Sequence, residues 1–468
     1  MSALTVANVA ASKISRRLAE YATGLRYNDL PAPTVEKTKQ AVLDLLGIAI
    51  RSSIEPGSSA VVRKVVEGFS VAGGSTAAGI GPRFLPHYAA LLNATFAHTL
   101  DFDDTHEGGS IHPGATTIPA VLAIAEASRA SGERVIAAIV AGYDTTVRIS
   151  EAADPAAHYD RGFHPTATCG TFGATAAAAN VAGASADVLE NAFGINGSQA
   201  AGSLQFLENG AWNKRIHTGF AAHNAILALC LAQAGAVGAR APIEGRNGFF
   251  RGYTDDADPD HVVKTLGERF AVDETAFKPY PSCRYSHAAI ELLCEVLSQE
   301  KLSADTIDRV RIGLPRKGMD IIGVPEAAKR APDGIVAGQF SMYFLAAVAL
   351  LRRRMIWDDY ALLGDAEIAR AIERIDVEID PEIEARFPTM AASIEVIAGE
   401  RRIRRVNWTP KGEPSKPLDW NELEEKFRSL ARAVYGDSHV SRIVATVRSL
   451  ETLDEITELT ALLGPPKA

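Results

Sequence analysis

Apolar residues recur at helical spacing through most of the first 265 residues, and this periodicity limits the fold more than any other feature of the chain. The alternation of apolar and polar residues that marks a half-buried strand is absent from the same region. Alanine, which has the highest helix propensity, is abundant throughout. An all-helical domain of many packed helices is therefore predicted for residues 1–268. Helices are expected over 12–25, 34–50, 58–70, 133–150, 166–181, 186–206 and 219–236.

The pattern changes after Phe270, where short segments alternate apolar and polar residues. This alternation predicts a small antiparallel sheet, with a hairpin turn at Gly399-Glu400. Residues 411–468 return to helical spacing and are expected to pack against the first domain. The chain is therefore predicted to be mainly α, with a smaller α+β lid domain, residues 269–410, inserted into a large all-helical domain. The alternating segments are 308–314, 375–380, 392–399 and 401–408.

The composition is that of an ordinary globular protein, with a mean hydropathy of +0.01 and a net charge of −9. No contiguous basic stretch indicates nucleic-acid binding. The most apolar runs, 225–236 and 340–351, are too short to span a bilayer, so no membrane segment is expected. The four cysteines form no CxxC pair, and the first 21 residues lack the apolar core of a signal peptide. A reduced, cytoplasmic protein is therefore predicted.

A polar cluster, HTLDFDDTHEGGSIH, interrupts the helical pattern. If the preceding helix continues through it, Asp101, Asp104 and Thr105 share one face, and Asp103 points elsewhere. A Gly-Gly-Ser turn can then fold His112 back over that face. The residues leave three interpretations open: a metal site, an acid–base pair in which a carboxylate orients a histidine, or a solvated helix end.

Further candidate residues occur at the starts of helices and at the junction between the predicted domains. Cations beside an apolar cleft are what a carboxylate substrate requires, and a buried phenol needs a hydrogen-bond partner. Each of these residues alone also fits an ordinary helix cap, a surface charge or a core side chain. They are His164 before Pro165, Lys214 and His217 at the start of an apolar helix, Lys278 and Arg284 at the junction, and Tyr343.

Four stretches together resemble the signature segments of the MmgE/PrpD family: HTLDFDDTHEGGSIHPG, GFHPTATCGTFGA, KPYPSCRYSHAAIE and GQFSMYFLAA. They follow one another in the family's order and span nearly the full chain. The family includes 2-methylcitrate dehydratase, cis-aconitate decarboxylase and iminodisuccinate epimerase. The resemblance implies a cofactor-free enzyme, a homodimer, and an active site between the helical domain and the lid. The family's site residues fall on Asp101, Thr105, His112, His164, Lys214, Lys278 and Tyr343, with Arg284 and His287 at further signature positions.

The resemblance predicts a lyase of the hydro-lyase type, which moves a proton alpha to a carboxylate of a small di- or tricarboxylate. His112, oriented by Asp101, is expected to exchange that proton. His164 or Tyr343 is expected to protonate the leaving group or the product carbon. No metal and no other cofactor is expected. The predicted catalytic residues are Asp101, His112, His164 and Tyr343, the predicted substrate-binding residues are Thr105, Lys214, Lys278 and Arg284, and Asp103 and His98 are interpreted as structural.

Two alternatives stay open. Within the family, decarboxylation or epimerisation of a related carboxylate, such as cis-aconitate or iminodisuccinate, is the second choice. Outside it, a metal-dependent hydrolase could use Asp101, Asp103, Asp104 and His112 as ligands. One departure narrows the substrate: the family's 2-methylcitrate dehydratases carry a Trp-containing insert after the Asp-Asp-Thr stretch, whereas residues 106–112 are shorter here. This difference argues against 2-methylcitrate itself.

Overall fold

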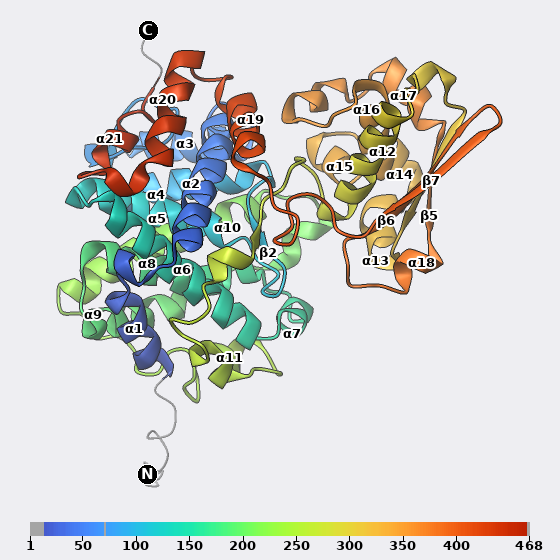
Figure 1. Cartoon of the computed structure of the whole chain (residues 1–468). Helices are drawn as coiled ribbons and strands as arrows, with labels where there is room; N and C mark the ends of the chain where they lie inside the picture. The colour runs from blue at the N-terminus through green and yellow to red at the C-terminus, as the bar shows by residue number, and fades with distance from the viewer. Residues whose placement is uncertain (1–13, 70–71, 466–468) are drawn as a thin grey trace. The chain divides into compact units, whose positions relative to one another are not determined.

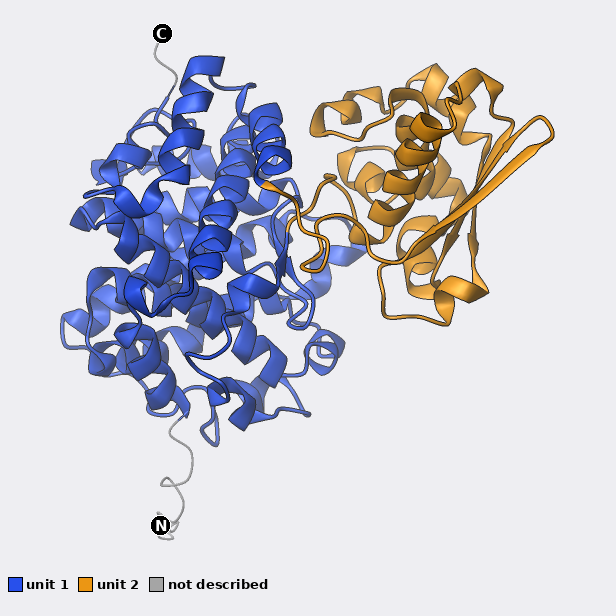
Figure 2. Cartoon of the chain, viewed as in Figure 1, with its two compact units in different colours: residues 1–276, 420–468 blue, residues 277–419 orange. Residues whose placement is uncertain are grey.

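The structure of the chain is a computed structural model that describes residues 14–69 and 72–465 (Figure 1). The chain divides into two compact units (Figure 2). The first contains the chain up to Ala276 and again from Trp420 onward, and the second contains Phe277–Asp419. The sequence predicted boundaries after residues 268 and 410, slightly before those in the structure, which follow Ala276 and Asp419. Residues 1–13, the larger part of the N-terminal segment considered above, lie outside the described residues.

The described part of the first unit is almost entirely helical, as predicted for a mainly α chain. Its central helix is α8 (Pro165–Ala182), in which every residue from Pro165 to Val181 is buried. A helix that is buried on all sides must be surrounded by other elements, and α8 contacts α5, α6 and α10. The helices are α1 (Ile14–Gly24), α2 (Ala32–Ser52), α3 (Ser58–Gly68), α4 (Pro86–Thr99), α5 (Pro113–Ser128), α6 (Gly132–Ala152), α7 (Pro155–Asp160), α8, α9 (Ala186–Asn196), α10 (Asn213–Gln233), α11 (Phe249–Tyr253), α19 (Trp420–Ala431), α20 (Asp437–Arg448) and α21 (Thr457–Thr460).

Small residues set how closely these helices approach. A Cβ added at Gly173 of α8 would lie 1.7 Å from Thr146 Oγ1 of α6, so only glycine fits that crossing. A Cβ added at Gly170 would lie 2.7 Å from Thr116 Oγ1, in the first turn of α5. Thr116 and Gly170 are both near the N-terminal ends of their helices. The starts of α5 and α8 therefore lie side by side, which brings together the residues that precede them.

The C-terminal helices belong to the first unit, where α19 packs against α2. Lys426 of α19 is buried and its Nζ lies 2.6 Å from Asp44 Oδ1 of α2. The same ammonium donates a hydrogen bond to the backbone oxygen of Phe102, at 3.0 Å. A buried ion pair of this kind specifies one arrangement of the groups around it. Here it holds the backbone that follows α4, in the polar cluster, against two distant helices.

The second unit contains a four-stranded sheet in the order β5–β4–β6–β7. The prediction of an antiparallel sheet is wrong for one strand, because β5 runs parallel to β4 while the other pairs are antiparallel. A segment with several helices connects β4 to β5, and a crossover of that length allows parallel pairing. The turn between β6 and β7 is at Gly399-Glu400, as predicted, with a positive φ at Gly399. The strands are β4 (Arg309–Leu314), β5 (Ile375–Ile379), β6 (Ala392–Ala398) and β7 (Arg401–Asn407), and the helices are α12 (His287–Gln299), α13 (Arg316–Gly318), α14 (Glu326–Arg330), α15 (Ile335–Gln339), α16 (Met342–Arg352), α17 (Ala366–Ile372) and α18 (Pro381–Glu384).

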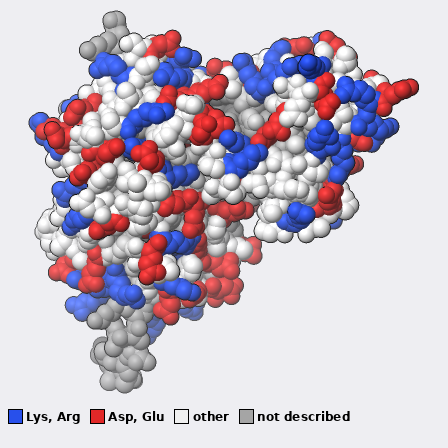
Figure 3. All heavy atoms as spheres, viewed as in Figure 1, with Lys and Arg blue, Asp and Glu red and all other residues white. Residues whose placement is uncertain are grey.

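The four arginines of β7 form the densest basic run of the chain, and each has an acidic partner. Arg401 and Arg405 contact Glu300, at 2.6 and 3.2 Å. Arg404 contacts Asp380 at 2.9 Å, and Arg402 lies 3.9 Å from Glu395. Figure 3 shows basic and acidic atoms mixed over this face of the molecule. The run is therefore a set of cross-strand and tertiary ion pairs.

The apolar runs considered for a membrane fall largely within α10 and α16. Every residue of α16 from Met342 to Leu350 is buried. Among the helices that the structure describes, none combines the length and the apolar character needed to cross a bilayer.

Candidate active site

The polar cluster of the first unit begins where α4 ends, at Thr99. Asp101 has a φ of +52°, a left-handed conformation that an α-helix does not contain. The prediction that Asp101, Asp104 and Thr105 share a helical face is therefore wrong. Aspartate side chains compete for nearby backbone donors and so favour turns over helix interiors, and three aspartates fall within four positions here.

A tight turn returns the chain from the strand β2 (Thr105–His106) to His112. The N–H of His106 donates to Ile111 O at 2.8 Å, and the N–H of Ile111 donates back at 3.3 Å. The N–H of Gly109 donates to His106 Nδ1 at 3.0 Å. β2 itself pairs with β3 (Thr275–Ala276). The Gly-Gly-Ser turn therefore fixes the backbone immediately before His112.

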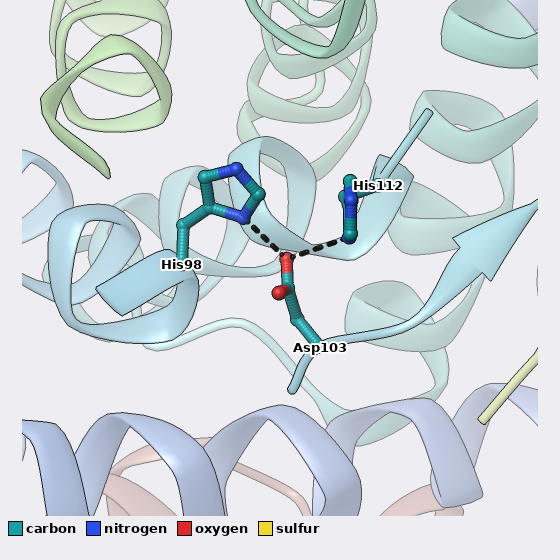
Figure 4. Close-up of side chains that lie close together, drawn as sticks. All are labelled: His98, Asp103 and His112. Atoms are coloured by element: carbon teal, nitrogen blue, oxygen red, sulfur yellow. Dashed lines mark hydrogen bonds and ion pairs between the residues drawn. The ribbon is translucent and has the colours of Figure 1, made fainter. Parts of the chain in front are cut away.

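Asp103 is the centre of the cluster, as Figure 4 shows. Its Oδ2 lies 2.7 Å from His98 Nδ1 and 3.3 Å from His112 Nδ1. The two imidazole rings meet edge to face, with centroids 4.8 Å apart. The sequence interpretation assigned the orientation of His112 to Asp101 and treated Asp103 and His98 as structural. The geometry instead makes Asp103 the carboxylate that contacts His112 Nδ1.

Asp103 is fully buried, yet its surroundings keep it ionised. Burial by itself raises the pKa of a carboxyl, but the imidazoles of His98 and His112 outweigh burial and hold the pKa of Asp103 well below its ordinary value. An ionised carboxylate only accepts hydrogen bonds, so a nitrogen that bonds to it carries the proton. For His98, that assignment places the proton on Nδ1 and leaves Nε2 buried without a hydrogen-bond partner among the described residues.

Asp101 holds a lysine on the other side of His112. Lys214 Nζ donates to Asp101 Oδ1 at 2.9 Å, and the same oxygen lies 4.0 Å from His112 Nε2. Burial lowers the pKa of a lysine, but Asp101 outweighs burial and raises the pKa of Lys214 above its ordinary value. The lysine is therefore a permanent cation next to His112. Asp101 positions this cation.

Three long helices begin at the cluster. His112 is the N-terminal cap of α5, His164 is the N-terminal cap of α8, and Lys214 is the second residue of α10. The backbone N–H of His112 donates to Thr166 Oγ1 in the first turn of α8, at 3.2 Å. Helix N-termini carry partial positive charge and free N–H groups. Together with Lys214 they make this end of the unit favourable for an anion.

His164 adds a third histidine and brings in a fourth. Its ring stacks against His98 with centroids 5.8 Å apart, and its Nδ1 lies 3.4 Å from His217 Nδ1. Burial lowers the pKa of His164, and the nearby His98 and Lys214 lower it further. Burial also lowers the pKa of His217, to about 4. His217 was named but given no role in the sequence analysis, although it stands three residues after Lys214, on the same side of one helix.

The two remaining members of the polar cluster differ in their contacts. Thr105 is buried, and its Oγ1 has no hydrogen-bond partner among the described residues, so one hydrogen bond of this hydroxyl is unused. Asp104 accepts hydrogen bonds from the Tyr143 hydroxyl at 2.7 Å and from the Gly114 N–H at 3.2 Å. Burial raises the pKa of Asp104 to about 7. Asp104 therefore contributes to packing at the start of α5.

Replacing Asp104 with asparagine should flatten the pH dependence of stability. The folded pKa of Asp104, about 7, lies above its unfolded value of about 3.9, so its contribution is complete below about pH 4 and is lost as the pH rises to 7. That loss is about 4 kcal/mol in the wild type, and an amide does not titrate. The melting temperature measured from pH 5 to pH 8 should therefore fall less in Asp104→Asn than in the wild type. Equal slopes would contradict the assignment, and Asp256→Asn, at an exposed position, is the matched control.

The remaining predicted residues belong to the second unit. Arg284 pairs with Glu413, so its charge is already offset within that unit. Tyr343 is buried, with the guanidinium of Arg330 4.3 Å from its ring centre, and burial raises the pKa of its phenol. Lys278 is also buried. The substrate and catalytic roles assigned to these three residues stay predictions.

The geometry also bears on the metal-dependent alternative. Ligand atoms of His98, Asp103 and His112 lie within 4.8 Å of one another, a spacing that a metal ion can use. His98 Nδ1 and Asp103 Oδ2 are at hydrogen-bond distance, so a metal would have to displace a proton shared by its own ligands. Asp104, one of the four ligands proposed from the sequence, bonds to Tyr143 instead. The hydrogen-bonded arrangement explains the observed distances without a metal.

A second group with metal-like spacing consists of His106, Glu151 and Glu274. Arg269 donates to both Glu151 oxygens at 2.8 Å and to Glu274 Oε1 at 2.6 Å. His261 Nε2 lies 2.9 Å from Glu151. The guanidinium already pairs with both carboxylates, and this favours an ion-pair network over a cation site.

Comparison with known proteins adds a family context. Residues 16–262 match the profile described as the MmgE/PrpD N-terminal domain, and residues 280–452 match the MmgE/PrpD C-terminal domain. The chain is 27% identical to a cis-aconitate decarboxylase-like protein of Aspergillus oryzae, over 96% of this chain and 97% of that protein. It is 27% identical to a cis-aconitate decarboxylase of Aspergillus terreus, over 98% and 97%. It is 25% identical to the cis-aconitate decarboxylase of Mus musculus, over 95% and 92%.

Proposed function

The chain belongs to the MmgE/PrpD family, and on that premise we propose that it is a cofactor-independent lyase acting on a small di- or tricarboxylate. One observation carries the proposal: at the starts of three helices, His112 contacts the ionised carboxylate of Asp103 through Nδ1, and its Nε2 lies 4.0 Å from Asp101, which holds the cation Lys214. The cation and the helix starts favour a bound anion. The imidazoles can donate a proton or stabilise negative charge on the substrate. The arrangement therefore suits carbon–acid chemistry beside a carboxylate.

Decarboxylation is the reaction we favour, with dehydration as the second candidate. The relatives described above are named cis-aconitate decarboxylases, and the match runs over at least 92% of their lengths. Their names change the order of preference that the sequence suggested. An unsaturated tricarboxylate of the cis-aconitate type carries three negative charges, which Lys214 and the helix starts help to offset.

The reaction needs one bond cleavage and one proton. The carbon–carbon bond to a carboxylate breaks, CO₂ leaves, and the electron pair moves through the double bond to the carbon alpha to a second carboxylate. That carbon takes one proton. In the proposed mechanism His112, held by Asp103, stabilises the negative charge on the second carboxylate, and His164 donates the proton. Lys214 binds a carboxylate, and the Thr105 hydroxyl donates a hydrogen bond to the substrate.

The test is a panel of cis-aconitate, citrate, 2-methylcitrate and iminodisuccinate, assayed in deuterated water. We expect CO₂ release from cis-aconitate, with one deuterium at the carbon alpha to a carboxylate of the product. Water loss from a hydroxy acid, without CO₂, would select dehydration. Activity should survive exhaustive chelation, whereas activity lost on chelation and restored by a divalent metal would support the metal-dependent alternative. The absence of both turnover and deuterium exchange with every compound would refute the proposal.

We further propose that the protein is a homodimer and that α3 and α10 form its interface. Both helices pack on α4. Ring contacts join them, since Tyr88 of α4 lies 5.5 Å from Phe69 and 5.6 Å from His223 of α10. Large apolar side chains on one continuous face favour association with a partner. The exposed large apolar residues within these two helices or next to their ends include Val61, Val65, Phe69, Trp212, Phe220, Leu227 and Leu231.

Replacing Phe220 with aspartate should convert the dimer to a monomer. Phe220 is 55% exposed in the single chain, and a dimer contact would bury it, so a charge there would be desolvated. The mass measured by size-exclusion chromatography with light scattering should halve. Val237→Asp, at a position that is 89% exposed, is the matched control and should keep the wild-type mass. An unchanged mass for Phe220→Asp would place the interface elsewhere.

The cysteines support the proposal of a cytoplasmic enzyme. None of the four forms a disulfide, and burial raises the pKa of the Cys169 and Cys294 thiols to about 12. Cysteines that form no disulfide are typical of a reducing compartment.

A further inference from the structure

His164 and His217 form a contact that the mechanism above does not yet use. Their Nδ1 atoms lie 3.4 Å apart, and their ring centres lie 5.6 Å apart. A contact between two ring nitrogens requires one of them to carry a proton and the other to accept it. The rings come from different elements, because His164 caps α8 and His217 lies in the first turns of α10. The contact therefore joins the start of α8 to the first turns of α10.

Both rings are neutral near pH 7. Burial lowers the pKa of His217 to about 4, with a smaller contribution from His98. Burial also lowers the pKa of His164 well below its ordinary value, and His98 and Lys214 lower it further. A neutral imidazole carries one proton, so the pair has two arrangements that differ in which ring donates through Nδ1. When His217 donates, the single proton of His164 is on Nε2.

The two rings differ in their access to solvent. His164 is 3% exposed and stacks on His98 within the cluster. His217 is half-buried, at the edge of the cluster. The Nε2 atoms of His164 and His217 have no hydrogen-bond partner among the described residues. Neither atom is one of the fully buried polar atoms that lack a partner. The pair therefore joins a buried ring that stacks within the cluster to a ring that is partly open to solvent. Phe206 lies against both rings, with centroids 6.2 and 5.9 Å away, and shields the contact between them.

We propose that His217 is a positioning residue that relays a proton from solvent to His164, which delivers it to the reacting carbon. This inference rests on the proposed decarboxylation, because loss of CO₂ with retention of the electron pair consumes one proton in every turnover. A buffer acid protonates His217 Nε2, the Nδ1 proton of His217 moves to His164 Nδ1, and the Nε2 proton of His164 goes to the carbon. Each ring ends neutral with its tautomer reversed.

A simpler role for His217 is to hold the ring of His164 by a hydrogen bond. His217→Asn distinguishes the two roles, because the asparagine amide can occupy the place of the histidine Nδ1 and keep the hydrogen bond. Asparagine cannot pass a proton from one side to the other. Alanine at the same position removes both the hydrogen bond and the relay and leaves space for a small molecule.

The experiment compares His217→Asn and His217→Ala in the full chain, with His439→Ala as a matched control in α20. In the relay, both His217 variants should lose kcat by about 10²-fold with little change in KM. Added imidazole should raise the kcat of His217→Ala several-fold and leave the wild type and His439→Ala unchanged. A wild-type kcat for His217→Asn, or the absence of rescue by imidazole, would overturn the relay.

A measurement without substrate keeps this inference separate from the proposed function. Nitrogen-15 NMR of the histidine side chains reports which ring nitrogen carries the proton. At pH 7 one of the two Nδ1 atoms should be protonated and the other bare, and His217→Ala should change the tautomer balance of His164. Two protonated or two bare Nδ1 atoms would overturn the relay even if no substrate in the panel reacts. If the wild type turned over substrate but both Nδ1 atoms were protonated or both were bare, the proposed function would be supported and the relay would be wrong.

Discussion

Replacing His112 with asparagine should lower kcat by about 10³-fold, because a group that stabilises the charge developing next to the reacting carbon contributes a factor of this size. His112 touches the ionised Asp103 through Nδ1, and its Nε2 faces the pair formed by Asp101 and Lys214. The measurement is the steady-state rate of CO₂ release, with the melting temperature as a test of folding.

The control for His112→Asn is His439→Gln, in α20. His439 Nε2 contacts the backbone oxygen of Leu462, and glutamine can retain a donor at that place. The control should keep wild-type kcat. If His112→Asn weakened binding, seen as a raised KM, while kcat stayed within about threefold of the wild type, His112 would be a binding residue only.

Replacing Asp103 with asparagine should be nearly as harmful, with a loss of about 10³-fold in kcat. One oxygen of Asp103 contacts both His98 and His112, so the substitution removes the charge that holds two rings. An amide also presents an N–H where an acceptor is needed, and this favours the wrong tautomer of the ring. The expected pattern is a fall in kcat with an altered pH profile and a smaller change in KM.

Asp101→Asn is the matched comparison for Asp103→Asn, because the two residues are two positions apart and both approach His112. Asp101 bonds to Lys214 at 2.9 Å and lies 4.0 Å from His112 Nε2, so its loss should affect substrate binding first. We expect kcat to fall by less than about tenfold, which is roughly 1.4 kcal/mol. A larger loss for Asp101→Asn than for Asp103→Asn would restore the assignment made from the sequence.

The fold class could be predicted because its signals are local. Helical spacing and abundant alanine indicated the helices of the first unit, and the Gly399-Glu400 turn indicated the hairpin of the second. The parallel pairing of β5 with β4 could not be predicted, since alternation within a strand does not record the direction of its neighbour. The polar cluster could also be identified from a local signal, because its residues interrupt the periodic pattern of the helices around it.

The sequence by itself determined which polar residues the first unit brings to the starts of α5, α8 and α10, because caps and first turns are marked by residue type. Only the tertiary structure decided how they pair. The helix that sequence spacing assumed ends at Thr99, and the positive φ of Asp101 takes the following backbone out of the helical conformation, so the three aspartates do not keep helical directions. The partners of Lys214 and His217 lie 113 and 53 residues away in the chain. Such contacts depend on how closely whole helices approach, and glycines such as Gly170 and Gly173 set that approach.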